Sequence, residues 1–195
     1  MSDIWDDYAE GWDSNQEVRI YSQKAFDELT NRIDIHGLRI LDFGCGTGLL
    51  TEKMSPIAGK IVAIDSSERM CSILKDKEHA NVTVLKGILT QHLIRSESLL
   101  QQPFDLIVAS SVFAFVDDFS AILKLLNSLL CKDGLLIHWD WKQTEQEPNF
   151  GFDMNGLKQF YQQADMRTIS ITEPFSLASE KGTMSVIMGV LKKGS

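Results

Sequence analysis

The sequence has few cysteines and no concentrated positive charge. Its three cysteines, Cys45, Cys71 and Cys131, lie far apart without metal-site spacing, and their odd number argues against a disulfide framework. The four histidines are equally scattered, the formal net charge is −8, and the pair Lys192-Lys193 is too short to form a phosphate-binding face. We therefore expect reduced thiols, no metal site and no nucleic-acid partner.

Long apolar runs are also missing. No stretch approaches the roughly 20 apolar residues that span a bilayer, and the segment Trp5-Asp6-Asp7-Tyr8 is acidic and aromatic, unlike a secretory signal. With 44% hydrophobic and 24% charged residues, the composition is that of a globular protein. We expect one cytoplasmic domain over residues 1–195, with no membrane association. A small molecule is the preferred partner, a protein the second choice, and the oligomeric state stays open.

From Arg39 onward, short apolar runs alternate with helical patterns. The runs predict strands over Arg39–Phe43, Lys60–Asp65, Val82–Lys86, Phe104–Ser110, Gly134–Trp139, Thr168–Thr172 and Met184–Leu191. The helical patterns lie at Gln16–Ile33, Leu49–Met54, Ser67–Lys77, Phe119–Leu130 and Asn155–Ala164. Such alternation predicts an α/β fold with a parallel sheet. The segment Pro174–Gly182 is too short for a crossover helix, so the last two strands should pair antiparallel.

The most informative segment is the glycine-rich run Leu41-Asp42-Phe43-Gly44-Cys45-Gly46-Thr47-Gly48. It follows the first core strand and precedes a helix, where open parallel sheets bind ligands. Glycines at alternate positions let the backbone turn sharply and let a ligand approach the main chain. Three glycines in five residues exceed what a strand-to-helix turn without a ligand needs, so we interpret the run as a binding loop.

The glycine spacing differs from that of nucleotide-binding loops. The dinucleotide pattern G-x-G-x-x-G would place its third glycine where Leu49 stands, and the Gly-Lys-Ser/Thr ending of a P-loop is missing. Asp42 would repel a pyrophosphate but suits a ligand that carries an ammonium group. These departures favour a nucleoside without phosphates over a nicotinamide dinucleotide.

Asp65 ends the second predicted strand. A carboxylate at this position can accept hydrogen bonds from both ribose hydroxyls of an adenosine that lies across the strand ends. The alternative is a negative charge at the start of a helix, a role that Ser66 or Ser67 could fill as a cap. Together with the glycine loop, ribose binding is the interpretation that we prefer.

On these residues the chain resembles the class I S-adenosylmethionine-dependent methyltransferases. The four matching motifs are Leu41–Gly48, Val62–Asp65, Phe104–Ser110 and Leu129–Gly134, so the resemblance runs from about Arg39 to Trp139. It implies a three-layer, doubly wound, seven-stranded sheet, mostly parallel with an antiparallel last strand. Residues 37–195 would form the core and residues 1–36 an N-terminal helical lid or extension. The implied cofactor is S-adenosylmethionine, and the product is S-adenosylhomocysteine.

The resemblance also implies roles for individual residues. Asp42 would lie near the amino group of the cofactor, and Asp65 would hold its ribose hydroxyls. The other implied cofactor-binding residues are Gly44, Cys45, Gly46, Thr47, Gly48, Ser66, Met70, Gly87, Ile88, Leu89, Ala109, Ser110 and Phe113. Ile88 departs from the polar residue of many relatives, so adenine recognition would depend on backbone groups and apolar packing. The segment Val112–Val116 lacks the histidines that many relatives carry there.

Two aromatic segments are candidates for the acceptor side. Trp5, Tyr8 and Trp12 predict either an aromatic lid over the cofactor or a helix that packs its apolar side on the domain. After the fifth strand, Trp139 and Trp141 could wall a cleft beside a carboxylate, an arrangement that suits a cationic or planar acceptor.

His138 and Asp140 are the candidates for a catalytic base. In the alternative that we prefer, His138 points into the core and Asp140 caps a turn. The predicted function is methyl transfer to an unidentified small-molecule acceptor. A protein methyltransferase and a non-catalytic S-adenosylmethionine-binding sensor or partner subunit stay open.

Overall fold

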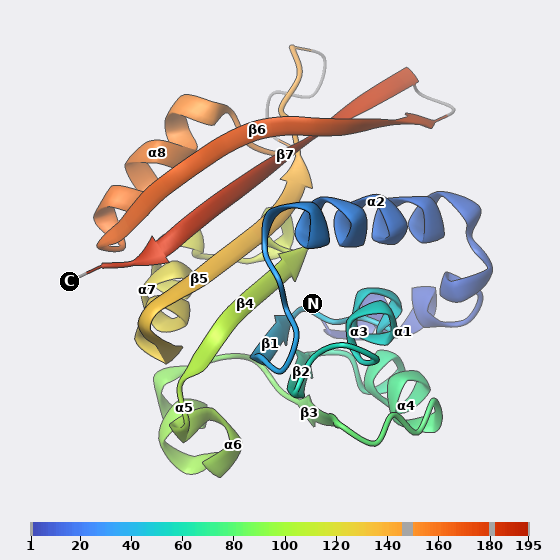
Figure 1. The fold of residues 1–195 in the computed structure, drawn as a ribbon. Helices are drawn as coiled ribbons and strands as arrows, with labels where there is room; N and C mark the ends of the chain where they lie inside the picture. Colours follow the sequence, from blue (N-terminus) through green and yellow to red (C-terminus); the bar gives the residue numbers. More distant parts are fainter. Residues whose placement is uncertain (1, 146–149, 180–181, 195) are drawn as a thin grey trace.

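Seven strands form one twisted sheet in the order β3-β2-β1-β4-β5-β7-β6 (Figure 1). The structure is a computed structural model, and it describes residues 2–145, 150–179 and 182–194. The strands are β1 (Arg39–Phe43), β2 (Lys60–Asp65), β3 (Val82–Lys86), β4 (Phe104–Ser110), β5 (Leu130–Trp141), β6 (Met166–Ser179) and β7 (Gly182–Lys193). Strands β1 to β5 pair parallel, whereas β7 is antiparallel to both β5 and β6. The predicted seven-stranded sheet with an antiparallel last strand is confirmed.

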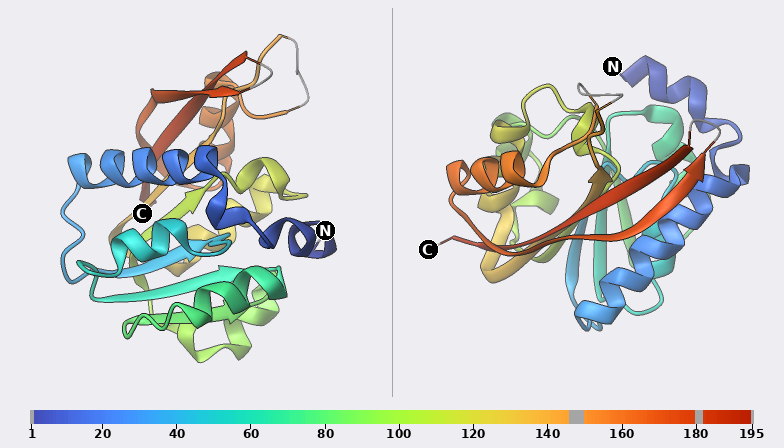
Figure 2. Two further views of the ribbon diagram at one scale, coloured as in Figure 1. Left: turned by 90° about the vertical axis from the view of Figure 1, so that its right-hand side faces the viewer. Right: turned by 90° about the horizontal axis from the view of Figure 1, so that it is seen from above.

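Helices cover both faces of the sheet, as Figure 2 shows. Their bounds are α1 (Ser2–Ala9), η1 (Trp12–Ser14), α2 (Gln16–Arg32), α3 (Leu49–Met54), α4 (Glu68–Asp76), α5 (Gln91–Ser96), α6 (Ser98–Gln101), η2 (Phe113–Phe115), α7 (Phe119–Leu129) and α8 (Met154–Gln163). Within the described ranges, no helix combines the length and apolar content that crossing a bilayer requires.

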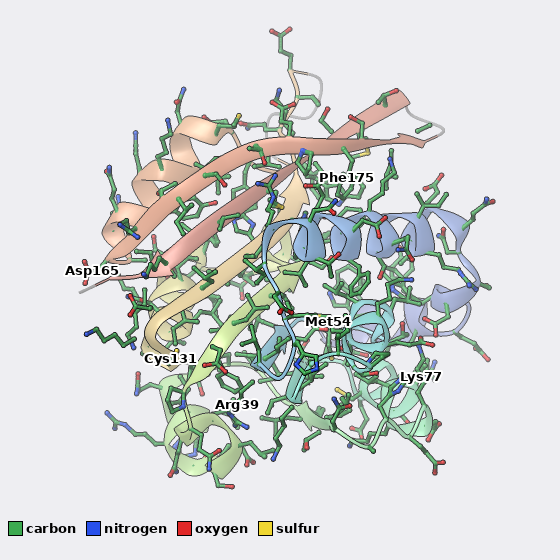
Figure 3. All side chains as sticks on the ribbon, viewed as in Figure 1. Arg39, Met54, Lys77, Cys131, Asp165 and Phe175 are labelled. Atoms are coloured by element: carbon green, nitrogen blue, oxygen red, sulfur yellow. The ribbon has the colours of Figure 1, made fainter. Side chains whose placement is uncertain are left out.

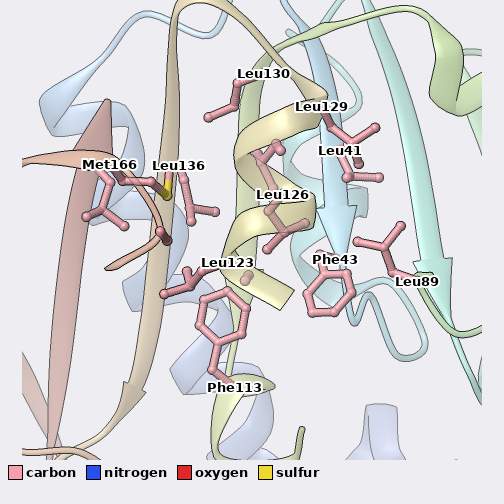
Figure 4. Packing of buried hydrophobic residues seen from close by; sticks show 14 of the residues in the cluster. Leu41, Phe43, Leu89, Phe113, Leu123, Leu126, Leu129, Leu130, Leu136 and Met166 are labelled. Carbon is pink, nitrogen blue, oxygen red and sulfur yellow. The ribbon is translucent and has the colours of Figure 1, made fainter. Parts of the chain in front are cut away.

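Alternation along the strands divides the core into two layers. In β1, Ile40 packs with Leu29 of α2 and Met54 of α3, while Leu41 faces the opposite way toward α7. Figure 3 shows Met54 and Phe175 on the α2 side of the sheet. The α7 side is filled by leucines, among them Leu126 (Figure 4). Both faces of the central strands are therefore buried, which explains their continuously apolar sequences.

Side-chain caps set the helix starts. Ser67 accepts a hydrogen bond from the Met70 amide at the start of α4, and Asp153 caps α8 by accepting from the Asn155 and Gly156 amides. Each capping residue stands just outside its helix. This is why α4 begins one residue later, and α8 one residue earlier, than the sequence pattern predicts.

The predicted antiparallel pairing of the last two strands is confirmed, but the predicted bounds of their connection, Pro174–Gly182, are wrong. Pro174 lies inside β6, at an irregularity of the β6–β7 register between Thr172 and Phe175. Because β6 is an edge strand, a proline there need not break the ladder. The β6–β7 pairing therefore extends as far as Ser179 and Gly182. The short helices α5 and α6 were not predicted either.

Replacing Leu126 by alanine tests the α7 layer. Its side chain is fully buried, so Leu126→Ala should lower the free energy of unfolding by about 2–5 kcal/mol. The exposed Ser128 of the same helix is the control, and Ser128→Ala should change that free energy by less than about 0.5 kcal/mol. Urea unfolding measures both; equal effects would contradict the described packing.

Candidate functional site

A cavity of about 1010 Å³ opens at the carboxyl ends of the central strands. The chain order reverses there, because β1 lies between β2 and β4. Open α/β sheets bind ligands at such a switch point. The cavity is bordered by the glycine loop after β1, the ends of β2 and β4, the loop after β3, the N-terminal segment and α2.

The three glycines of the loop play different parts. Gly44, Gly46 and Gly48 all have positive φ, at 71°, 53° and 86°. A Cβ at Gly44 would collide with Val112, and one at Gly48 would collide with Leu74, whereas the nearest atoms to a Cβ at Gly46 would be 3.9 Å away. Gly44 and Gly48 thus allow close packing, and Gly46 presents its open face to the cavity.

Asp65 is fixed by two backbone amides. Its Oδ2 accepts from the Gly46 N–H at 2.9 Å, and its Oδ1 accepts from the Ser67 N–H at 2.9 Å. Burial raises the pKa of Asp65, while these hydrogen bonds counteract the rise. Each carboxylate oxygen keeps capacity for another donor. Asp65 lines the cavity, so hydroxyl groups of a ligand could reach it.

Asp42 lies deeper at the end of β1. It is 1% exposed, accepts a hydrogen bond from the Thr51 hydroxyl at 2.5 Å, and still borders the cavity. Burial raises its pKa to about 7, against the hydrogen bond from Thr51, and the nearby charge of Asp65 adds to the rise. Such a carboxyl group gains its charge most easily beside a cation.

Most residues assigned to the cofactor by resemblance meet at this cavity. Its lining includes Asp42, Gly44, Cys45, Gly46, Asp65, Ser66, Met70, Gly87, Ile88, Leu89 and Ser110. Ile88 is 68% exposed, so a ligand there would cover an apolar side chain. Four assigned residues lie outside the lining, namely Thr47, Gly48, Ala109 and Phe113. Ala109 and Phe113 belong to the core on the α7 side, so they can support the site but do not face it.

Two aspartates attach the N-terminal segment to the rim of the cavity. Asp6 accepts a hydrogen bond from the hydroxyl of Ser67 at 2.5 Å. Asp13 accepts from the Thr47 hydroxyl at 2.5 Å and forms an ion pair with Lys77 at 2.8 Å. The segment therefore packs on the domain next to the glycine loop.

The same segment brings two tryptophans to the cavity. Trp5 and Trp12 line it with their rings 6.0 Å apart, and Trp5 also packs edge-on against Phe115 at 4.9 Å. Tyr8 is 58% exposed and lies outside the lining. The segment therefore packs on the domain and also presents two aromatic rings to the cavity, while its role as a lid over the cofactor stays a prediction.

His138 and Asp140 are buried away from the cavity. His138 Nδ1 lies 2.9 Å from Asp140 Oδ2, and its Nε2 lies 2.5 Å from the Tyr161 hydroxyl. Asp140 Oδ1 accepts from the Phe113 and Ala114 amides, at the start of η2. Burial raises the pKa of Asp140, while the hydrogen bond with His138 acts against it. His138 thus points into the core and Asp140 caps a turn, and both lie outside the lining of the cavity.

Trp139 does not wall the cleft. It is fully buried in the core on the α2 side, whereas Trp141 lines the cavity and donates from Nε1 to the Ser111 hydroxyl at 3.1 Å. The two side chains share one face of β5, but Trp139 stands two residues deeper in the sheet, where other elements cover it.

Other lining residues were not predicted. They include Val18, Tyr21 and Ser22 of α2, and Leu177 and Met184 of the β6–β7 hairpin. The helical spacing of the α2 residues was visible in the sequence, but it equally fits a face that packs on a core.

Comparison with known proteins identifies the class. A family model described as a methyltransferase domain matches residues 17–178. The chain belongs to this family, the class I S-adenosylmethionine-dependent methyltransferases. A malonyl-[acyl-carrier protein] O-methyltransferase of Bacillus anthracis is 25% identical over 150 residues, which cover 70% of this chain and 54% of that protein. A ubiquinone biosynthesis O-methyltransferase of Caulobacter sp. (strain K31) is 34% identical over 109 residues, covering 54% and 42%. The chain spans about half the length of the curated relatives it matches.

Solved structures share the fold. A SAM-dependent methyltransferase from Aquifex aeolicus has a TM-score of 0.76 at 19% identity, covering 96% of this chain and 98% of that one. The DhpI–SAH complex gives 0.74 at 17% identity, covering 98% and 94%. At these identities the similarity shows the architecture alone.

Removing the Tyr161 hydroxyl tests whether the His138–Asp140–Tyr161 cluster is structural. Tyr161→Phe leaves His138 Nε2 buried without a partner, so the free energy of unfolding should fall by about 1–3 kcal/mol. Affinity for S-adenosylhomocysteine, measured by calorimetry, should stay unchanged. Tyr8→Phe, at an exposed tyrosine, is the control for stability. Lost affinity with intact stability would contradict a structural role.

Proposed function

We propose that the chain is an enzyme that transfers a methyl group from S-adenosylmethionine to a small-molecule acceptor. The observation that carries the proposal is the hydrogen bond from the Gly46 amide to Asp65 Oδ2, which joins the glycine loop and the strand-end carboxylate in one cavity wall. The family match supports the same cofactor.

The lining residues fit the parts of this cofactor. Asp65 would accept the ribose hydroxyls with its free acceptor capacity, and Asp42 would accept from the ammonium group. The open face of Gly46 allows a ligand to approach the main chain. Apolar side chains such as Met70 and Leu89 would flank the adenine. When bound, S-adenosylmethionine supplies a methyl group on a positively charged sulfur, an already activated carbon.

The contribution of the protein is orientation and exclusion of water. Trp5, Trp12, Phe115 and Trp141 give the cavity rigid aromatic walls. Walls of this kind hold an acceptor atom in line with the reacting carbon and shield both from solvent. A small-molecule acceptor is supported by the ubiquinone biosynthesis enzyme among the relatives, whereas the malonyl-[acyl-carrier protein] enzyme is named for a small acyl group carried on a protein.

A transfer assay tests the proposal. The protein is incubated with S-adenosylmethionine labelled in its methyl group, together with separate metabolite and protein pools. Label should appear in the metabolite pool and not in the protein pool. Label in proteins alone would contradict the small-molecule acceptor, and binding without transfer to either pool would indicate a sensor.

Asp65→Ala should weaken binding of S-adenosylhomocysteine by about 1–3 kcal/mol, the cost of losing hydrogen bonds to a charged group. Glu68→Ala is the matched control, because it removes the same charge from an exposed position three residues away. Calorimetric titration measures both. Unchanged affinity in a folded Asp65→Ala protein would remove Asp65 from the site.

Binding should also depend on pH through Asp42. With a pKa of about 7 in the free protein, this group is mostly neutral at pH 6 and mostly charged at pH 8. A cofactor ammonium selects the charged form, so affinity should rise about tenfold between pH 6 and pH 8. In Asp42→Asn the rise should disappear. A wild-type affinity that is flat, or that falls with pH, would contradict this role.

A further inference from the structure

Beyond the cofactor-binding residues, the cavity extends between α2 and the β6–β7 hairpin. We call this part the acceptor lobe, and it is lined by Val18, Tyr21, Ser22, Trp141, Leu177 and Met184. Its parts lie together, since the rings of Tyr21 and Trp141 are 5.2 Å apart and Leu177 pairs with Met184 across the hairpin. Figure 1 shows the far end of the hairpin above α2.

The acceptor lobe contains no positive charge. None of its six lining residues is cationic, and the nearby lysines are turned elsewhere. Lys24 lies over the ring of Phe175 at 5.5 Å, and Lys142 pairs with Glu173 at 2.7 Å. A carboxylate or phosphate bound here would lose its water without gaining a counter-charge, which is costly in an apolar lobe.

The ionisable groups around the whole cavity are predominantly acidic. Within the part of the chain that the structure describes, the lining includes five carboxyl side chains and one amine, those of Glu17, Asp42, Asp65, Asp117, Asp118 and Lys124. The resulting potential attracts cations and repels anions.

Two buried hydroxyls in the acceptor lobe lack partners. The side chains of Tyr21 and Ser22 are each 6% exposed, and neither Tyr21 Oη nor Ser22 Oγ makes a hydrogen bond. Burial is the main cause that raises the pKa of Tyr21 well above its usual value, and the negative charge of Asp140 adds to the rise. The nearby Ser111 hydroxyl lowers this pKa slightly, but it forms no hydrogen bond with Tyr21 Oη. Tyr21 is therefore a neutral phenol. Burying such groups unpaired is unfavourable, so they indicate a ligand with a polar head.

We propose that the acceptor lobe binds a primary or secondary amine carried on a flat apolar body, and that it discriminates against carboxylates. The aromatic rings of Tyr21 and Trp141 would contact the apolar body or a protonated nitrogen. The two hydroxyls, which neighbouring atoms cover in the free protein, would turn toward the lobe to hydrogen-bond the nitrogen. This inference rests on the proposed methyl transfer and specifies its acceptor. An amine acceptor differs from the oxygen acceptors for which two relatives are named. These relatives are 25% and 34% identical to this chain.

An amine suits the chemistry of the lining. An amine that binds as its ammonium ion first loses one proton to water. The neutral nitrogen then uses its lone pair to form the N–C bond to the methyl carbon, while the S–C bond breaks and its electron pair stays on sulfur, so the positive charge moves from sulfur to nitrogen. An ammonium group gives up its proton far more readily than a hydroxyl group does, so the lining needs no strong base.

Three probes with one skeleton test the charge preference: 1-naphthylmethylamine, 1-naphthalenemethanol and 1-naphthoate. Each is titrated at pH 7.5 into protein saturated with S-adenosylhomocysteine. The amine should bind at least about tenfold more tightly than the carboxylate, with the alcohol between them. Equal or tighter binding of naphthoate would overturn the proposal, and so would the absence of binding by all three.

Variants locate the preference in the acceptor lobe. Tyr21→Phe should weaken amine binding about tenfold while S-adenosylhomocysteine affinity stays unchanged. Met184→Arg places a cation in the wall and should reverse the order of amine and carboxylate, whereas Met184→Leu should preserve it. An unaltered order in Met184→Arg would place the probes elsewhere and overturn the proposal.

The cofactor titration is done first, which separates this inference from the function on which it rests. A protein that takes up S-adenosylhomocysteine but prefers naphthoate refutes the amine alone. A protein that does not take up the nucleoside refutes the proposed function, and the same probes titrated into the free protein then test the acceptor lobe by itself.

Discussion

The site depends on one contact between the ends of two neighbouring strands. The Asp65 carboxylate at the end of β2 accepts from the Gly46 amide, and the Gly44 and Cys45 amides donate to the Ile64 carbonyl of the same strand. These bonds hold the loop after β1 in a turn that only glycine adopts readily. The result is a carboxylate with free acceptor capacity beside exposed backbone, which defines what the cavity can bind.

The rest of the structure supports this contact from several sides. Asp13 and Asp6 of the N-terminal segment attach to residues that flank the loop and Asp65, so both tryptophan rings are held at the rim. On the opposite side, the buried His138–Asp140–Tyr161 cluster fixes the turn after β4. The two candidates for a catalytic base help to hold a loop in place, and the cavity is lined by aromatic rings, aliphatic and acidic side chains and the glycine loop.

Sequence reasoning was most successful where one continuous segment carries the information. Strands β1 to β4 were predicted with their observed bounds, because each is a short run dominated by apolar residues. Strands β1, β2 and β4 are buried on both faces, and β3, at the edge of the sheet, is half-buried. It was less successful where tertiary context decides. Pro174 indicated a break but sits at an edge-strand irregularity, and α5 and α6 are too short to show a period. The cofactor side follows from contiguous motifs, whereas the acceptor lobe combines α2, β5 and a hairpin that only folding brings together.

The most direct measurement is a crystal structure of the protein with S-adenosylhomocysteine. We expect both ribose hydroxyls within hydrogen-bond distance of the Asp65 carboxylate, the amino group beside Asp42, and the sulfur facing the space bordered by Tyr21 and Trp141. A nucleoside bound with its ribose away from Asp65, or outside this cavity, would contradict this expectation.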